Sequence, residues 1–401
     1  MKKNYSKSLI LVLILVMSIA IITGCSNNDP SVDSSVNKNG ENDSNSNSVN
    51  SEENYDGKLV FDYSLELDYA KNFSVDYYKG GYKLIKISDG RQFLTVPEGM
   101  STPTDLESGV VALQMPIENV LISSTPTMSL IDSIGKLDRV ALTTTKLDSW
   151  YIDNVVEKMN SGEIKYIGEY KAPDYEMLTA EKPPFSVFST MLSTVPEVAE
   201  KLVELNIPVL LDQATYEEHP MARVEWVKLY GALFDCEEEA KKVFDEQIAY
   251  IDSLDLSNAS GKTASIFYVT SKGVLHARQA GDYMVKMLEL AGGEYILSDL
   301  YPTETGTEKL EFEEFYSRAK DSDYIIYIWS LGGKPETLAD FTAINELFAD
   351  FKAVKEGNVW CTTPDYFQIS DTLGYMIKDI NEMLSLDDSS VDKLTYLFRL
   401  K

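Results

Sequence analysis

The chain has 401 residues, and its 64 acidic against 36 basic residues give a formal net charge of -28. A surface this acidic argues against nucleic acid and against anionic membrane patches as partners. It does not identify a ligand, because a local pocket can carry the opposite charge. The length is sufficient for two domains with substantial cores.

The N-terminus has the pattern of an export signal. Three lysines precede an apolar run of about fourteen residues from Leu9 to Ile22, too short for a comfortable transmembrane helix but suited to a signal-peptide core. Residues 21–25, Ile-Ile-Thr-Gly-Cys, resemble the lipobox of bacterial lipoproteins. The resemblance implies cleavage before Cys25, acylation of its thiol and tethering to the outer face of the cell membrane. An ordinary signal peptide is the alternative.

Residues 26–54 are almost entirely small or polar and contain no aromatic residue. Such a segment cannot bury enough apolar surface to offset the entropy of ordering it, which predicts a flexible tether. The other two cysteines, Cys236 and Cys361, have no metal-type spacing; they form either a disulfide or two buried free thiols.

The folded part opens with a predicted three-stranded meander over residues 73–96, because Gly80-Gly81 and Asp89-Gly90 suit tight hairpins. From about residue 110, short buried runs alternate with amphipathic stretches, a pattern typical of parallel sheets. In this block we expect a helix at 195–206 and strands at 119–123, 139–142, 185–188 and 207–211.

An amphipathic helix follows at 221–234, and a longer helix with acidic residues in its first turn runs to about residue 254. A second alternating block has expected strands at 264–269, 324–328 and 358–361 and helices at 282–291 and 371–384. The fold class is therefore α/β, with two α/β lobes bridged by a single long helix. The expected parts are a signal peptide at 1–24, a tether at 25–55, an N-terminal lobe at 56–234, a linker helix at 235–255 and a C-terminal lobe at 256–401.

The chain lacks the HExxH, CxxC, GxSxG and P-loop motifs, and it has only two histidines. The absence of these signatures favours a binding protein over an enzyme. A lipid-anchored surface hydrolase with a spatially assembled site is the alternative, and a surface adhesion or assembly protein is a third possibility.

The two-lobe arrangement resembles the substrate-binding lipoproteins of ABC importers for iron–siderophore complexes, haem and cobalamin. The resemblance spans residues 73–384, and the local patterns that carry it lie at 89–97, 134–140, 176–183, 291–295 and 320–325. It implies a monomeric receptor that needs no cofactor or metal of its own, holds a small-molecule metal complex in the cleft between the lobes, and delivers it to an ABC permease. The sequence leaves siderophore, haem and corrinoid open.

In this family one glutamate on each lobe docks against the permease. The resemblance maps the first onto Glu176, although Pro184 stands where an aspartate is usual, and the second onto Glu314, with Glu313 as the competing choice. An exposed carboxylate gives electrostatic steering and register rather than much affinity.

Ligands of α/β folds bind beyond the carboxyl ends of the strands. That rule selects loops at 123–125, 213–216, 270–278, 329–330 and 363–367. Arginine binds two oxygens of a carboxylate at once, although either arginine in this region could instead form a surface ion pair. The two histidines are ligands, packing residues or a pair that clamps a metal or haem iron. The predicted ligand-binding residues are Ser124, Thr125, Tyr216, His219, Arg223, His276, Arg278, Trp329, Tyr366 and Phe367.

Overall fold

The computed structural model describes residues 57–386 and 390–401. The predicted signal peptide, Cys25 and the tether lie outside the described residues. Among the residues described, no helix has both the length and the apolar character needed to cross a membrane.

The chain opens with a five-stranded sheet in the order β1-β2-β3-β4-β5. The predicted meander is confirmed, because β2, β3 and β4 pair in antiparallel fashion, and β5 then joins β4 in parallel. Alternate residues of β2 are buried, as expected for a strand with one solvated face. The strands are β1 (Phe61–Ser64), β2 (Phe73–Tyr78), β3 (Lys83–Ile87), β4 (Gln92–Val96) and β5 (Val110–Gln114).

The next sheet is parallel throughout, in the order β12-β11-β6-β7-β8. Its first four strands coincide with the four predicted strands to within two residues at each end. They are β6 (Val120–Ile122), β7 (Val140–Thr143), β11 (Ser186–Ser189) and β12 (Val209–Asp212), followed at the edge by β8 (Lys165–Tyr166); β9 (Gly168–Glu169) and β10 (Ala172–Pro173) form a separate pair. The accompanying helices are α1 (Thr125–Ser133), α2 (Asp153–Ser161), α3 (Tyr175–Glu181) and α4 (Pro196–Glu204).

The last sheet is mixed, so the expectation of a purely parallel sheet is wrong here. β13, β17 and β18 are parallel, whereas β14, β16 and β19 run antiparallel to their neighbours. The predicted loop over 270–278 is also wrong at its end, because residues 275–278 pair with β13 as β14. The strands are β13 (Thr263–Val269), β14 (Leu275–Arg278), β15 (Glu294–Tyr295), β16 (Thr307–Leu310), β17 (Tyr324–Tyr327), β18 (Val359–Thr362) and β19 (Leu397–Arg399).

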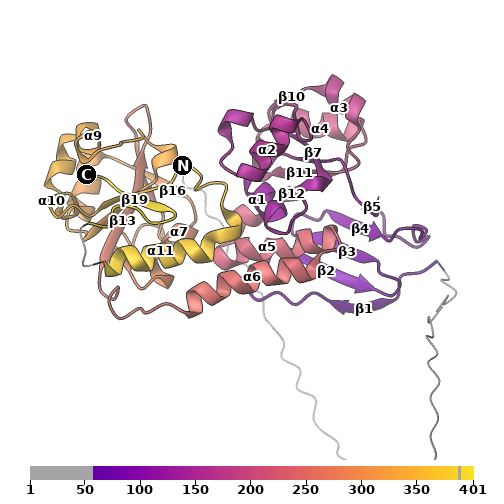
Figure 1. Ribbon diagram of the computed structural model, residues 1–401, viewed down its shortest axis with the longest axis horizontal. Coiled ribbons are helices and arrows are strands. Elements are labelled where there is room, and N and C mark those ends of the chain that lie inside the picture. Colours follow the sequence, from indigo (N-terminus) through magenta and orange to yellow (C-terminus); the bar gives the residue numbers. More distant parts are fainter. Residues whose placement is uncertain (1–56, 387–389) are drawn as a thin grey trace, which may run out of the picture. The chain divides into compact units, whose positions relative to one another are not determined.

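A layer of three helices joins the two α/β parts (Figure 1). The long helix predicted to run to about residue 254 forms as α6 (Glu237–Asp252), and it packs against both α5 (Pro220–Leu233) and α11 (Leu373–Ser385). We call the part from β1 to α5 the N-terminal lobe and the part from β13 to β19 the C-terminal lobe. The C-terminal lobe also contains α7 (Tyr283–Leu290), α8 (Phe312–Ala319), α9 (Leu338–Ile344) and α10 (Lys352–Lys355).

Two glycines allow this layer to pack closely. A Cβ added at Gly231 of α5 would lie 2.5 Å from the Cβ of Ala240 in α6, and one at Gly374 of α11 would overlap the backbone of Gln247 in α6. Gly231 lowers the helix propensity of α5, but its missing side chain lets the two helices meet.

Two buried glutamates attach the N-terminal segment to the helical layer. The Glu225 carboxylate accepts the backbone N–H groups of Asp68, Tyr69 and Ala70 at 2.8 to 2.9 Å. Glu217 accepts those of Lys71 and Asn72, together with the indole N–H of Trp226. Five consecutive backbone donors are thereby satisfied without secondary structure.

Both described cysteines are buried free thiols, so the disulfide alternative is excluded in this structure. Cys236 precedes α6, and burial raises the pKa of its thiol to about 11. Cys361 lies in β18, where burial also raises the pKa. Neither thiol has the lowered pKa of a reactive cysteine.

Glu225→Gln is expected to lower the free energy of unfolding by about 2 to 4 kcal/mol, because a buried, multiply hydrogen-bonded carboxylate loses its charge and one acceptor. The measurement is urea denaturation followed by circular dichroism. Glu200→Gln, a change on the exposed side of α4, should be neutral. Equal stability of the two variants would contradict the anchoring role of Glu225.

Candidate functional site

A cavity of about 370 Å³ lies between the two lobes, within the size range of small-molecule sites. The N-terminal lobe provides α1, α5 and the short helix Ala214–Tyr216 (η4), and the C-terminal lobe provides β14, α7 and the segment after β18. The lining residues are Pro126, Thr215, Tyr216, Arg223, Arg278, Asp282, Tyr283, Thr305, Gly306, Tyr366, Phe367, Ser370 and Leu373.

Arg278, the last residue of β14, is the cation in the C-terminal wall of the cavity. Arg278 is only 6% exposed, and its Nη1 lies 3.5 Å from Oδ2 of Asp282. Nε and Nη2 have no hydrogen-bond partner among the described residues. Burial opposes the charged form, yet Asp282 and the nearby tyrosines keep the pKa of Arg278 above its ordinary value. The site therefore holds a buried positive charge with two unused donors.

Asp282 is already committed to the protein. Its Oδ1 accepts the N–H of Met284 and so caps α7, while its Oδ2 also accepts the N–H of Gly306 at 3.0 Å. This carboxylate cannot close around Arg278 without giving up these bonds, so Arg278 is only partly neutralised.

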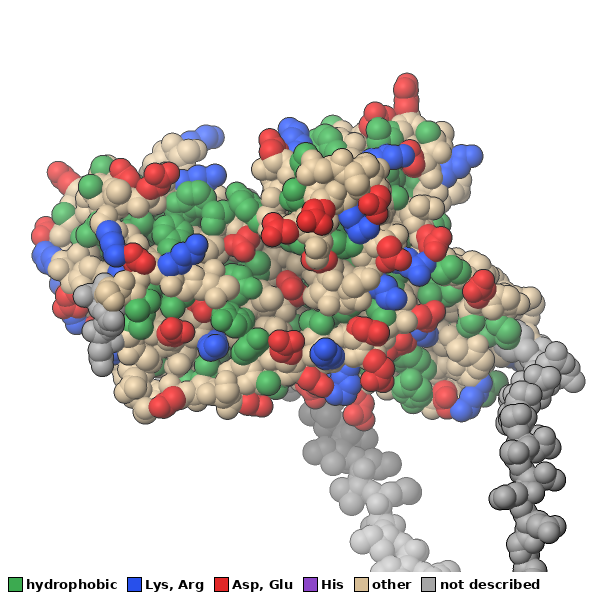
Figure 2. All heavy atoms as spheres, in the orientation of Figure 1, with side chains coloured by type: hydrophobic (Ala, Val, Ile, Leu, Met, Phe, Trp, Pro, Cys, Tyr) green, Lys and Arg blue, Asp and Glu red, His purple; other side chains and the backbone are tan. Residues whose placement is uncertain are grey.

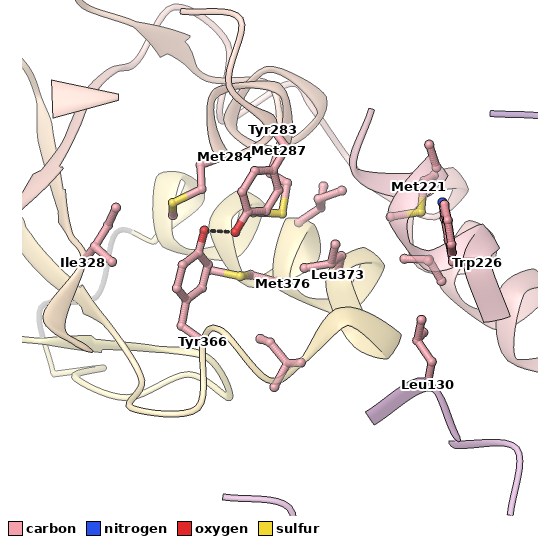
Figure 3. Close-up of a cluster of buried hydrophobic side chains, with 14 of the residues drawn as sticks. Leu130, Met221, Trp226, Tyr283, Met284, Met287, Ile328, Tyr366, Leu373 and Met376 are labelled. Carbon is pink, nitrogen blue, oxygen red and sulfur yellow. Dashed lines mark hydrogen bonds between the residues drawn. The ribbon is translucent and has the colours of Figure 1, made fainter. Parts of the chain in front are cut away.

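Two tyrosines form an aromatic wall of the cavity that Arg278 also lines. Figure 3 shows their side chains pointing toward each other. The hydroxyls of Tyr283 from α7 and Tyr366 from the segment after β18 are hydrogen-bonded to each other, and their rings are stacked at 6.4 Å. Met376 of α11 lies beside them. Burial raises the pKa of both hydroxyls, which keeps them protonated; one O–H donates to the other hydroxyl, so a single donor of the pair stays free.

Arg223 reaches this wall from the N-terminal lobe. Its guanidinium carbon lies 3.6 Å from the centre of the Tyr283 ring, a cation–π contact between the lobes. Nε and Nη2 donate to the carbonyls of Glu217 and Thr215, which holds η4 against α5. Arg223 thus positions Tyr216, the last residue of η4.

The structure brings five of the ten predicted ligand residues to this cavity: Tyr216, Arg223, Arg278, Tyr366 and Phe367. The other five do not line it. Ser124 caps α1 by accepting the N–H of Thr127, Thr125 begins that helix, and the Trp329 indole donates to the carbonyl of Pro335. His276 stacks on Tyr268 in the C-terminal sheet.

His219 lies in an adjoining cavity, also of about 370 Å³, that shares Tyr216 with the inter-lobe cavity. Its Nδ1 accepts the N–H of Met221 and so caps α5, while its ring stacks on Tyr69. Burial is the main cause of its lowered pKa. The imidazole is therefore neutral at pH 7 and serves as a cap in this structure.

Sequence reasoning missed Asp282 and Tyr283, which it treated only as a helix start, and Pro126, Thr305, Gly306, Ser370 and Leu373. The signal for the first two was local: an aspartate N-cap two residues after Gln279-Ala280 orients the first turn of α7 toward the end of β14. The others come from segments that carry no motif.

The predicted docking glutamates lie on separate helices. Glu176 is exposed in the first turn of α3. Glu314 is in the first turn of α8, where it lies 3.4 Å from Arg318 and keeps half of its side chain exposed; Glu313 beside it is also exposed. Each sits where the helix dipole favours a carboxylate, and each is accessible.

A family model described as periplasmic binding protein matches residues 121–366, more than half of the chain. The chain belongs to this family. The resemblance drawn from the sequence and the two-lobed fold class are thereby confirmed.

Relatives and solved structures agree with this assignment. The uncharacterized lipoprotein MJ0878 of Methanocaldococcus jannaschii is 25% identical over 387 residues, covering 90% of this chain and 89% of the relative. A periplasmic heme binding protein of Pseudomonas aeruginosa has a TM-score of 0.55 at 11% identity, covering 71% of this chain and 98% of that one. The petrobactin-binding protein YclQ of Bacillus subtilis has a TM-score of 0.54 at 14% identity, covering 76% and 99%. These two structures support the fold alone.

On the face of this periplasmic binding protein shown in Figure 2, acidic side chains are scattered over both lobes among lysines and arginines rather than gathered on one element. The formal net charge of the whole chain is -28, whereas buried Arg278 brings a positive charge to the cavity wall. Because the local charge opposes the global charge, the cavity is a distinct electrostatic environment.

A pH-dependent contact lies near this cavity, where α1 packs against the short helix Ser370–Thr372 (η7). Burial raises the pKa of Asp371 to about 6; a hydrogen bond from Ser129 lowers it, and Asp132 and Asp365 raise it. A carboxyl group whose pKa is higher in the folded state favours folding when it is protonated. Its contribution is therefore lost as the pH rises from about 4 through 6.

Asp371→Asn is expected to be more stable than the parent protein at pH 7, by up to about 2 kcal/mol, and the difference should shrink toward pH 4.5. Urea denaturation at both pH values measures it. Asp148→Asn, at a second and exposed aspartate, should show no such trend. A stability difference that is constant or grows on acidification would show that the Asp371 carboxyl is not held protonated by the fold.

Proposed function

We propose that the chain is an extracytoplasmic solute-binding lipoprotein that captures an anionic metal complex, such as an iron–siderophore, haem or corrinoid, and delivers it to an ABC importer. The single observation that carries this proposal is the pair of unpartnered nitrogens on buried Arg278 in the cavity wall.

A buried guanidinium without its full set of partners is costly, because burial removes the water that would otherwise solvate it. An incoming anion can recover that cost by accepting hydrogen bonds from Nε and Nη2, which form one edge of the planar fork. The hydroxyls of Tyr283 and Tyr366 lie in the same wall, and the one that accepts from the other adds a neutral donor. A carboxylate or catecholate edge of a metal complex has the chemistry to use them all.

Aromatic surfaces around the cavity suit a flat or bulky ligand. Phe367 is 37% exposed and Tyr216 is 60% exposed, so both rings can cover a bound group. Tyr216 also lines the two cavities that adjoin the main one, with Gln213 in the first and His219 in the second. A small movement of this ring would join them and admit a ligand larger than the main cavity.

Further support comes from relatives and from the resemblance in sequence. The relative MJ0878 carries the name lipoprotein, and one solved structure with the same fold is titled a heme binding protein and another a petrobactin-binding protein. Acylation at Cys25, the tether, the lobe boundaries near 235 and 255, and permease docking through Glu176 and Glu314 belong to the proposal. In it, the protein works as a monomer and makes or breaks no covalent bond of its ligand.

Titration of the purified full chain with haem, cobalamin, ferric citrate and a ferric-siderophore panel, followed by tryptophan fluorescence, tests the proposal. At least one should bind with a Kd below roughly 10 µM. If none of them binds at that concentration, the ligand classes proposed for this cleft are wrong.

Arg278→Met is expected to weaken an anionic ligand by about tenfold to a hundredfold, because a charge-assisted pair is lost, while a neutral ligand changes little. Arg318→Met on α8 is the control, because this arginine pairs with Asp299 and Glu314 and does not line the cavity, so the Kd of both ligands should stay unchanged. If the Kd values of anionic and neutral ligands rise equally, Arg278 does not recognise the charge of the ligand.

Glu176→Gln and Glu314→Gln should each reduce uptake in cells at least several-fold while leaving the Kd in solution unchanged, since a rim carboxylate acts on encounter and register. Glu204→Gln on α4 is the matched exposed control. Unimpaired uptake in the double variant would exclude these two glutamates from docking.

A further inference from the structure

One side-chain amide connects the two lobes beside the cavity. Gln368, in the segment after β18 of the C-terminal lobe, donates from Nε2 to the carbonyl of Ser149 at 2.8 Å. Its Oε1 accepts the backbone N–H of Tyr151 at 2.9 Å. The carboxamide therefore pairs with the backbone of the N-terminal lobe through both of its ends, as a neighbouring strand would.

The N-terminal half of this contact is held in place by its own lobe. Ser149 ends the short helix Leu147–Ser149, and Trp150 between the two bonded residues is 6% exposed. The Trp150 indole N–H donates to the carbonyl of Thr145 at 3.2 Å. The Ser149 carbonyl thus presents a fixed acceptor to Gln368, and the Tyr151 N–H presents a fixed donor.

The C-terminal half of the contact is continuous with the cavity wall. Tyr366 and Phe367 immediately precede Gln368, Ser370 and Leu373 follow it, and all four line the cavity. The Gln368 backbone N–H donates to the carbonyl of Asp365 at 2.6 Å, which fixes a tight turn. Any change in how Gln368 meets the N-terminal lobe therefore moves the rings that face the ligand.

The amide is buried as well as paired, since Gln368 is only 7% exposed. Separating the lobes here would break both hydrogen bonds together. It would leave three polar groups without these partners: the Gln368 carboxamide, the Ser149 carbonyl and the Tyr151 N–H. Two other contacts also join the lobes: the cation–π contact of Arg223 with Tyr283, and the packing of α1 on η7. Of these three contacts, the Gln368 contact alone combines two hydrogen bonds to backbone groups of the opposite lobe with residues of the cavity wall on both sides in sequence.

We infer that Gln368 is a positioning residue that clamps the lobes together and sets the Tyr366–Phe367 wall against the ligand. The clamp is a reversible element: in the parted state water satisfies the same groups, so ligand binding tips the balance toward the closed state. This inference rests on the proposed function only in taking the cavity as the ligand site.

Amide hydrogen exchange and hydroxyl-radical footprinting of the ligand-free full chain test the clamp without any ligand. In Gln368→Ala, exchange at the Tyr151 N–H should be about tenfold faster, because the side-chain oxygen that accepts this N–H is gone. Labelling of the Tyr283 ring, which is 8% exposed, should also rise severalfold, since parted lobes uncover it. Tyr230, fully buried in α5, is the internal reference.

Gln368→Glu sharpens the test. A glutamate keeps an acceptor for Tyr151 but places a carboxylate oxygen against the Ser149 carbonyl, so the lobes should part although the side chain is nearly the same size. Gln247→Glu is the matched control, because that buried amide accepts the Tyr375 N–H within the helical layer and does not cross to the other lobe at the cavity. Faster exchange confined to Tyr151, with Tyr283 labelling unchanged in both Gln368 variants, would overturn the clamp.

Measuring ligand dissociation distinguishes a failure of the clamp from a failure of the proposed function. With haem or ferric citrate as the probe, dissociation from Gln368→Ala should be about tenfold faster, with little change in the association rate. If neither probe nor any other member of the panel binds the parent protein, the proposed function fails, and the exchange and footprinting results still decide whether the clamp exists. If a probe binds and its dissociation rate is unchanged in both variants, the clamp is rejected while the proposed function stands.

Discussion

The close packing of α5, α6 and α11 is the constraint on which the site depends. Gly231 and Gly374 let these helices approach to backbone contact, so the elements that leave the layer have fixed starting points. α5 carries Arg223 to the edge of the N-terminal lobe, and α11 begins at Leu373 in the cavity wall. If the layer were looser, Arg223 could not stay 3.6 Å from the centre of the Tyr283 ring. The close packing of the layer therefore fixes the positions of the site residues that its helices carry.

Within that frame, the chain treats its buried charges in two ways. Glu217 and Glu225 are saturated by backbone donors, and they serve the fold. Arg278 is left with two free donors although it is also buried, and Asp282, the one carboxylate paired with it among residues 57–386 and 390–401, is occupied by the α7 cap. A fold that pairs Glu217 and Glu225 and leaves Arg278 open at the cavity has the preorganisation expected of a binding site. Leaving Arg278 partly unpaired lowers the stability of the folded protein, because a buried charge without its partners is unfavourable.

Much of the architecture could be predicted because it follows from hydrophobic patterning. The meander, the buried strands of both lobes and α6 are apolar runs with clear turn or cap residues at their ends. The strands that were missed, such as β14 and β16, are short and partly polar, and their pairing is decided by distant partners. The mixed order of the C-terminal sheet therefore could not be read from local sequence.

The site was half predictable for a related reason. Arg223, Arg278 and Tyr366 follow predicted strands, so the rule for strand ends selected them. Ser124, His219 and His276 also satisfied the rule, but the first two side chains are used as helix caps and the third packs in the sheet. The decisive facts, that Arg278 has unused donors and that Gln368 reaches Ser149 across 219 positions of sequence, exist only in three dimensions.

In the proposed site, Arg278 recognises the negative charge of the ligand. A crystal structure of the protein with the tightest-binding member of the ligand panel would test this recognition. Ligand oxygens should lie about 2.7 to 2.9 Å from Nε and Nη2 of Arg278, the distances of charge-assisted bonds. A ligand that sits in the cleft while both nitrogens stay without an anionic partner, or one that binds elsewhere on the protein, would contradict it.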